Sequence, residues 1–478
     1  MSRPDLKKGT ALANQTFASQ NLSDQANKHQ RIVPPAFIYV FGALGGLLFG
    51  FDTGVISGAL LFIRENISLS SFGEGAVVSG VLLGAMIGGI GVSSLADKYG
   101  RKRMIIVSSI IFAIGAIGCA LAPGMWTLIL ARIVLGVAVG AASALVPMYL
   151  SEMAPAARRG SISALNQLMI MIGILTAYLV NLWFSNFNHS WRLMLGFAVI
   201  PSILMLIGGL FLPESPRYLA GIGQESRARL ILEGLRGPAN TNLVNAEMKE
   251  IEEASNVPKG KFSDIFEPWM RPALVSGLGL AILVQFVGCN TVIYYAPTTF
   301  TQIGMGKNAA LLSTVGIGVF EVIVTVIAVV VMDRFKRRTL LMFGAAGMGL
   351  SLTVLGLVNL IGSDGSSTKA IITVVFTTIY IMFFASTWGP LTWVTIGEVF
   401  PLFVRGQAVG FCSSMDWLAN LVVALTFPVL LSVMGTSVFL IYAVVCFFTL
   451  WFIRYKMFET RGRSLEDIEE GMRKAHTS

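Results

Sequence analysis

The sequence predicts an all-α polytopic membrane protein, with twelve transmembrane helices in two pseudo-symmetric six-helix bundles. Three observations support this prediction. The 478 residues are 54% hydrophobic and only 13% charged, whereas soluble domains are about 25% charged. Twelve apolar runs are long enough to span a bilayer, which takes roughly 20 residues per crossing. Two charged motifs of the first half recur in the second half, which indicates a duplicated bundle.

The twelve predicted spans fall into two sets of six, on either side of a polar segment with two helical patterns, 223–236 and 241–255, and a Gly-Pro break between them. We expect an N-terminal tail (1–35), a first bundle (36–212), a helical linker (213–268), a second bundle (269–457) and a C-terminal tail (458–478). The spans are expected at 36–60, 76–96, 104–122, 125–150, 161–185, 192–212, 270–300, 309–332, 339–362, 369–397, 405–430 and 435–457.

Lysine and arginine determine the expected orientation. They are concentrated in the connections after the second, fourth and eighth spans, at 98–103, 158–159 and 334–338, while the alternate connections hold few. Because positively charged loops stay in the cytoplasm, both termini and the linker are expected there, in a multi-pass protein of the plasma membrane. The net charge of +9 is therefore assigned to these loops and not to binding of nucleic acid.

Two connections of the first half recur in the second half. ADKYGRKR at 96–103 is similar to MDRFKRR at 332–338, and SEMAPAARRG at 151–160 is similar to GEVFPLFVRG at 397–406. Each copy places a carboxylate at a helix end beside basic residues. This pattern predicts cytoplasmic ion pairs that hold the halves together in one state and break in the other; the alternative is a topology signal plus helix capping. The candidate gate residues are Asp97, Arg101, Glu152, Arg159, Asp333, Arg337, Glu398 and Arg405.

Several classes of site are not expected. The four cysteines lie in apolar stretches without paired or metal-ligand spacing, so neither disulfides nor a metal site is predicted. The sequence contains no GxxxxGK[ST] phosphate loop, which disfavours an ATP-driven pump. The N-terminus is polar to about Arg31 and shows no signal peptide.

The seventh predicted span carries polar side chains within an apolar run. Gln285, Asn290 and Tyr294 lie in the stretch AILVQFVGCNTVIYYAPTTF at 281–300. Amides in hydrocarbon need partners, so these side chains are expected to face the inside of a bundle. On a regular helix the two amides would lie about 140° apart, but nearby glycines and Pro297 allow a bend that brings them together. Broken helices with polar groups at mid-depth are typical of transporter substrate sites; the alternative is that the amides only join helices.

Seven motifs, in order, carry a resemblance to the sugar porter family of the major facilitator superfamily, from about residue 36 to 470. The resemblance implies twelve helices in two bundles around a central sugar site that works by alternating access. The expected partners are a monosaccharide, a proton and the bilayer. We expect a monomer as the functional unit and no cofactor besides the coupling proton. The motifs are GGLLFGFDTGVISG (45–58), RIVLGVAVG…PMYLSEMAP…RRG (132–160), PESPRYL (213–219), QFVGCN…YYAP (285–297), GPLTWVTIGEVFP (389–401), DWLAN (416–420) and FETRGRSLEDIE (458–469).

Asp52 is an acid in the first predicted span, with no neighbouring charge in sequence. An ionised carboxylate inside a membrane is costly, so it must pair, meet water or take up a proton. Arg132, in the fourth span, is the expected partner. In proton symporters that the chain resembles, the matching Asp and Arg are taken as the coupling pair. The alternative is a static buried salt bridge.

The resemblance also implies the sugar contacts. A sugar needs amides that donate and accept hydrogen bonds, and an aromatic ring for its apolar face. By motif position, Trp393 is expected to stack on the sugar, and Phe49 and Trp417 to line the cavity. Gly389 with Pro390 is expected to let the tenth span bend. Polar contacts are expected from Gln167, Gln285, Asn290 and Tyr294.

The chain departs from the family pattern at several positions. Val284 replaces the first of two adjacent glutamines, and Asp416 stands where many relatives have Gln or Asn. Because an ionised carboxylate accepts but cannot donate a hydrogen bond, hydroxyl recognition by Asp416 is altered, or the group is protonated.

Glu321, in the eighth span, could touch substrate, couple to protons or pair within the bundle.

These observations predict a secondary active transporter that imports a monosaccharide, a pentose or a hexose, with a proton, and no enzymatic activity. Three alternatives remain. An uncoupled sugar facilitator would share the fold, and a carrier for a polyol such as inositol, or an exporter, is compatible with Val284 and Asp416. A nutrient sensor built on a transporter body is disfavoured by the short C-terminal tail.

Overall fold

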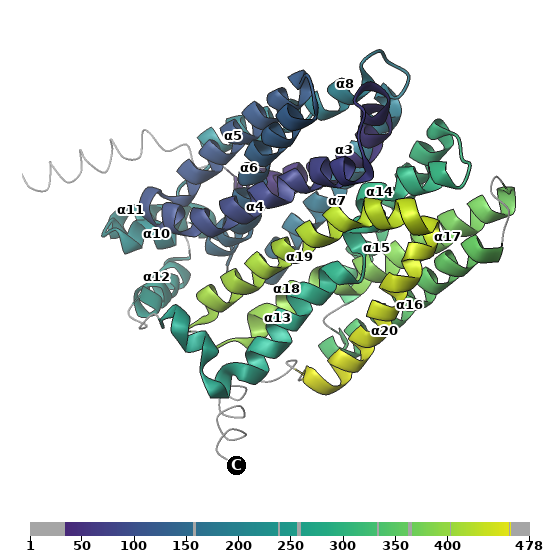
Figure 1. The fold of residues 1–478 in the computed structure, drawn as a ribbon. Helices are drawn as coiled ribbons and strands as arrows, with labels where there is room; N and C mark the ends of the chain where they lie inside the picture. The colour runs from purple at the N-terminus through teal and green to yellow at the C-terminus, as the bar shows by residue number, and fades with distance from the viewer. Residues whose placement is uncertain are drawn as a thin grey trace, which may run out of the picture.

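The computed structural model describes residues 34–155, 159–237, 240–255, 260–331, 334–361, 366–401, 403–457 and 459. All the regular elements within these ranges are helices, and most of them run along two bundles that lie side by side (Figure 1). Helical structure is expected because the apolar environment cannot satisfy the backbone N–H and C=O groups of any open element.

The first bundle contains six crossings, of which the first and the sixth are each formed by two consecutive helices. The crossings are α2 (Pro35–Gly42) with α3 (Leu44–Asn66), α4 (Ser71–Tyr99), α5 (Arg101–Leu121), α6 (Met125–Met153), α7 (Arg159–Phe184), and α8 (Ser190–Gly196) with α9 (Val199–Phe211).

Helices α4 and α6 pack backbone against backbone. Four glycines at their contact face a carbonyl oxygen of the other helix so closely that a Cβ atom would lie 2.0–2.1 Å from it. Small residues permit this close approach, which is a common way for membrane helices to associate. The four are Gly84 and Gly88 on α4, and Gly136 and Gly140 on α6.

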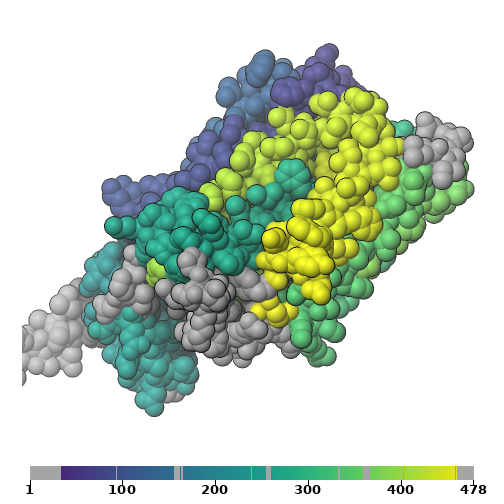
Figure 2. Space-filling model, turned by 60° about the horizontal axis from the view of Figure 1, so that its bottom comes forward, coloured from purple at the N-terminus to yellow at the C-terminus, as the bar shows by residue number. Residues whose placement is uncertain are grey.

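A polar linker joins the two bundles. It contains α10 (Pro216–Gly221), α11 (Glu225–Arg236), α12 (Thr241–Ser255) and the 3₁₀ turn η2 (Phe262–Phe266). Helices α11 and α12 occupy the two patterns read from the sequence, and Gly237 ends α11 with a φ of 88°. The linker helices project from one end of the bundles (Figure 2). We call this the linker end, and the opposite end the far end.

The second bundle repeats the arrangement with more interruptions. Its elements are η3 (Pro268–Met270), α13 (Arg271–Phe286), α14 (Cys289–Gln302), α15 (Lys307–Val331), α16 (Arg337–Ile361), α17 (Ser367–Phe383), the π-helical turn η5 (Phe384–Trp388), α18 (Gly389–Val399), α19 (Arg405–Met434), the 3₁₀ turn η6 (Gly435–Val438) and α20 (Phe439–Lys456).

The described residues contain eleven apolar helical stretches that are long enough to cross a membrane. The last of these, Arg405–Lys456, has 52 residues, which at 1.5 Å per residue is more than twice the roughly 30 Å hydrocarbon thickness. It contains two helices, α19 and α20, which are separated at Gly435 (φ 57°). The described chain therefore crosses twelve times, and the predicted fold class is confirmed.

Two helices of the second bundle are broken at mid-depth. Between α13 and α14, Gly288 adopts a φ of 94°, which L-residues rarely reach, so glycine is required there. The tenth crossing is interrupted by η5, which ends directly before Gly389 and Pro390. The sequence predicted a bend at Gly389–Pro390; the irregular turn lies just before them, and Pro390 occupies the first turn of α18, where its missing N–H is tolerated.

Candidate transport site

A buried ion pair lies in the centre of the first bundle. Asp52 on α3 and Arg132 on α6 are 2% and 1% exposed, and Nη1 of Arg132 lies 3.4 Å from Oδ1 of Asp52. Nε of Arg132 has no hydrogen-bond partner within the described ranges. The structure thus brings together the two residues that were predicted to pair, in a site shielded from water.

A chain of hydrogen bonds lies in the centre of the second bundle. Nδ2 of Asn290 donates to Oε1 of Gln285, and Nε2 of Gln285 donates to Oδ1 of Asp416, each at 2.7 Å. Gln285 lies in the last turn of α13 and Asn290 in the first turn of α14, so the break at Gly288 brings together two amides that a regular helix would hold apart. Asp416 comes from α19, and its hydrogen bond with Gln285 was not predicted from the sequence.

Tyr294 is a buried side chain on α14. It is 4% exposed, and its hydroxyl accepts a hydrogen bond of 3.4 Å from Nδ2 of Asn420. Asn420 belongs to the motif DWLAN but was not singled out from the sequence. Its side chain links α19 to α14 beside the amide chain.

The remaining predicted sugar contacts include side chains that meet across the two halves. The rings of Phe49 on α3 and Trp417 on α19 lie 5.7 Å apart. A Cβ atom on Gly389 would lie 3.8 Å from Nε2 of Gln167 on α7. Trp393, on α18, is 40% exposed. The candidate site is therefore built from both bundles.

Glu321 is a further buried acid, on α15. It is 1% exposed, and neither of its carboxyl oxygens has a hydrogen-bond partner within the described residues. One turn earlier, Gly318 packs against Leu175 and Tyr178 of α7. Glu321 thus lies near the contact between the two halves and not on an open surface.

The predicted gate residues form ion pairs at the linker end. Arg101 at the start of α5 pairs with Asp97 (2.9 Å) and with Glu152 at the end of α6 (3.1 Å). In the second bundle, Arg337 lies 3.5 Å from Glu398. In this conformation each of these pairs joins residues of one half.

Three other gate residues are described less fully. Nε of Arg405 donates to the carbonyl oxygen of Phe400 (3.2 Å). The backbone of Arg159 begins α7, while its side chain and the whole of Asp333 lie outside the described residues.

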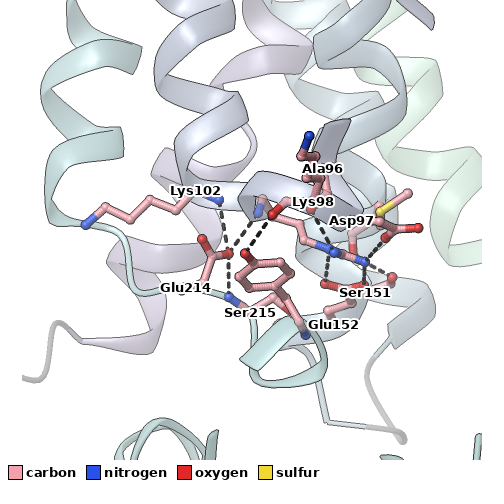
Figure 3. Close-up of polar contacts among 11 residues, drawn as sticks. Ala96, Asp97, Lys98, Lys102, Ser151, Glu152, Glu214 and Ser215 are labelled. Atoms are coloured by element: carbon pink, nitrogen blue, oxygen red, sulfur yellow. Dashed lines mark hydrogen bonds and ion pairs between the residues drawn. The ribbon is translucent and has the colours of Figure 1, made fainter. Parts of the chain in front are cut away.

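Two acids at the linker end were missed in the sequence. The Glu214 carboxylate accepts hydrogen bonds from the backbone N–H groups of Arg101 (2.9 Å) and Lys102 (3.2 Å) at the start of α5 (Figure 3). Glu459 accepts in the same way from Arg337 (3.1 Å) and Arg338 (3.3 Å) at the start of α16. A carboxylate at a helix N-terminus is favoured by the helix dipole. The signal was present as a repeat of Glu-Ser and Glu-Thr in PESPR and FETRGR.

The far end holds contacts between the two halves. A Cβ atom on Gly75, near the start of α4, would lie 2.6 Å from the carbonyl oxygen of Leu425 on α19. Glu65 at the end of α3 forms an ion pair with Lys307 at the start of α15. The two bundles are therefore closed against each other at this end.

Comparison with known proteins identifies the family. A family model described as "Sugar (and other) transporter" matches residues 38–472. The chain is 52% identical to a D-xylose transporter of Levilactobacillus brevis over 444 residues, which are 93% of this chain and 97% of that protein.

Solved structures agree with this result. The E. coli xylose transporter XylE, in a partially occluded inward-open conformation, matches with a TM-score of 0.79 at 30% identity, over 90% of this chain and 99% of that one. XylE bound to 6-bromo-6-deoxy-D-glucose, described as a proton:xylose symporter, matches with a TM-score of 0.75 at 30% identity, over 92% and 99%. The chain belongs to the sugar (and other) transporter family of the major facilitator superfamily and is a multi-pass membrane transporter, not an enzyme.

Proposed function

We propose that this transporter imports a monosaccharide together with a proton by alternating access, as a monomer in the plasma membrane with both termini in the cytoplasm. The observation that carries the proposal is the buried Asp52–Arg132 pair, since a carboxylate 2% exposed within a membrane protein needs either a cation or a proton. The names of the relatives, a D-xylose transporter and a proton:xylose symporter, support the same assignment.

The proton step follows from the geometry of the pair. At 3.4 Å the Arg132 guanidinium stabilises the ionised form of Asp52. When a change of conformation moves Arg132 away, the carboxylate loses its counter-charge in a dry environment and takes up a proton. Asp52 thereby alternates between an ion pair and a neutral acid, which links proton binding to the movement of the halves.

The sugar step is assigned to the second bundle and to side chains of the first bundle that face it. Asn290 and Gln285 supply amide groups, and the half-exposed Trp393 supplies a ring for the apolar face of a sugar. A monosaccharide is small enough for such a site, and its hydroxyls both donate and accept hydrogen bonds. The relative that carries a D-xylose name makes a pentose the first substrate to test.

The conformation described here is proposed to be inward-facing. The two bundles are in contact at the far end, through Gly75 with Leu425 and through Glu65 with Lys307. With the linker in the cytoplasm, the far end is the outer side, and its closure corresponds to an inward-facing carrier. The ion pairs at the linker end, Arg101–Glu152 and Arg337–Glu398, are proposed to reorganise when the halves close on that side.

Transport by the purified protein in liposomes tests the proposal. Pentoses, hexoses and inositol are added outside liposomes that contain a pH-sensitive dye, and labelled sugar entry is followed in parallel. Acidification inside that depends on both the protein and a monosaccharide is expected. Sugar entry without acidification would instead identify a facilitator, and entry of inositol alone would identify a polyol carrier.

A further inference from the structure

The hydrogen-bond chain in the second bundle has a direction. A carboxylate oxygen accepts hydrogen bonds, whereas an amide both donates through its nitrogen and accepts through its oxygen. Because Oδ1 of Asp416 accepts, the Gln285 side chain must present its nitrogen to Asp416. Oε1 of Gln285 then faces Asn290 and must accept, so Asn290 must donate.

Amide orientation is normally ambiguous, since oxygen and nitrogen are nearly equivalent in shape and are assigned from the surrounding hydrogen bonds. While Asp416 is ionised, the acceptor at this end of the chain removes the ambiguity. An amide at position 416, such as the Gln or Asn of many relatives, would permit either direction, because it could donate to Oε1 of Gln285 as well as accept from its nitrogen.

The buried positions of the first two members hold the direction in place. Asp416 is 6% exposed and Gln285 is 8% exposed, so water competes little for their hydrogen bonds, and reversal would leave two acceptors facing each other. Such an unsatisfied buried contact costs about 1–3 kcal/mol. Asn290, by contrast, is only half-buried.

We infer that Asp416 is a positioning residue for sugar recognition: by fixing the direction of the Asp416–Gln285–Asn290 chain, it makes Asn290 present an undivided carbonyl oxygen and one N–H group to the substrate. This inference rests on the proposed function. The hydrogen-bond chain uses one N–H of Asn290 and leaves both lone pairs of its oxygen free. The site therefore selects a sugar with a hydroxyl that donates to Oδ1 of Asn290.

Reversing the chain by two substitutions tests the inference. Asn290→Asp alone places an acceptor opposite Oε1 of Gln285, and sugar affinity should fall by at least about tenfold, which corresponds to one lost buried hydrogen bond. Asp416→Asn added to Asn290→Asp recreates the chain in the opposite direction: Asn at 416 donates to Gln285, and Gln285 donates to Asp at 290. The double variant should bind the sugar at least about threefold more tightly than Asn290→Asp alone.

Affinity is measured with the full-length protein in liposomes, as competition with labelled D-xylose, or another sugar that the wild type transports, in counterflow exchange. Size-exclusion profiles establish that each variant is folded. Ser414→Ala on α19 is the matched control, with unchanged affinity expected, because the Ser414 hydroxyl donates within its own helix to the carbonyl oxygen of Gly410. A residue that only filled space would give no recovery in the double variant.

Substrate analogues provide a second readout that does not need the double variant. At the ring position whose hydroxyl donates to Asn290, the deoxy and the deoxyfluoro sugars should both bind the wild type weakly, because fluorine cannot donate. Asp416→Asn lets the chain reverse, so the penalty for the deoxyfluoro sugar should fall by at least about threefold. Asp416→Glu keeps an acceptor and should keep the wild-type pattern.

Three outcomes would overturn the inference: unchanged affinity in Asn290→Asp, a double variant that is no better than Asn290→Asp, or an unchanged analogue pattern in Asp416→Asn. In each of these, sugar-dependent proton entry by the wild type would leave the proposed function intact. A wild type that transports no monosaccharide would remove the proposed function and the inference together.

Discussion

In the first bundle, the buried polar group at the centre is an ion pair on α3 and α6, two helices that run past it without interruption. In the second bundle, it is a chain of two amides and a carboxyl group, held by a helix that breaks at Gly288. The linker ends differ far less, since Glu214 and Glu459 accept from the first N–H groups of α5 and α16 in the same way.

The comparison indicates that the two copies remained similar in the loops at the linker end and diverged in the buried polar groups at the centres of the bundles. In the first bundle, the glycine contacts pack α4 tightly against α6, the helix that carries Arg132. A broken helix exposes side chains from two helix ends to one cavity, which suits a ligand with several hydroxyls. On this account the first bundle carries the proton, and the second bundle supplies most of the sugar contacts.

The largest effect is expected from breaking the backbone contact of α4 and α6. Gly140→Val would place a side chain against the carbonyl oxygen of Ala85, where even a Cβ atom would lie 2.0 Å away. We expect a loss of about 3 kcal/mol of stability, measured by thermal unfolding in detergent. Gly316→Val on α15 is the control, since a Cβ atom there meets nothing within 4 Å; equal losses in the two variants would contradict the packing argument.

Asp52→Asn should remove coupling while leaving the sugar contacts. Each coupled proton contributes a factor of ten to sugar accumulation per pH unit. The variant should therefore lower steady-state accumulation by about tenfold at a gradient of one pH unit, with counterflow exchange retained. Accumulation at the wild-type level would show that the ion pair is only structural.

Gln285→Ala should weaken sugar binding and leave proton coupling unchanged. Loss of a buried amide that joins Asn290 to Asp416 should weaken sugar binding by about 1–3 kcal/mol, measured by competition in counterflow exchange. Gln407→Ala removes a glutamine at the linker end of α19, where it donates to Gly260, and should leave affinity unchanged. An unchanged affinity in Gln285→Ala would exclude the amide chain from the sugar site.

The smallest effects are expected at the linker end, where the bundles are alike. Glu214→Gln and Glu459→Gln each weaken a carboxylate contact with a helix N-terminus, which is worth about 1 kcal/mol. The two variants should lower the unfolding temperature by similar amounts. A large effect of only one would show that the repeat has diverged in these loops as well.

Hydrophobic patterning predicted the twelve crossings and the linker helices because that information is local. The pairing of Asp52 with Arg132 was also predictable, since a buried carboxylate has few possible cationic partners. The bond from Gln285 to Asp416 was not, because it depends on how α13 packs against α19, 131 positions away. The helix caps by Glu214 and Glu459 were overlooked for a different reason, since only a comparison of PESPR with FETRGR reveals them.

The most direct test of the division between the bundles is the proton-to-sugar ratio, measured side by side for the wild type, Asp52→Asn and Gln285→Ala in liposomes with a pH dye and labelled sugar. We expect the ratio to fall by about one in Asp52→Asn and to stay at the wild-type value in Gln285→Ala, although its sugar affinity is lower. A wild-type ratio in Asp52→Asn, or a reduced ratio in Gln285→Ala, would contradict the account.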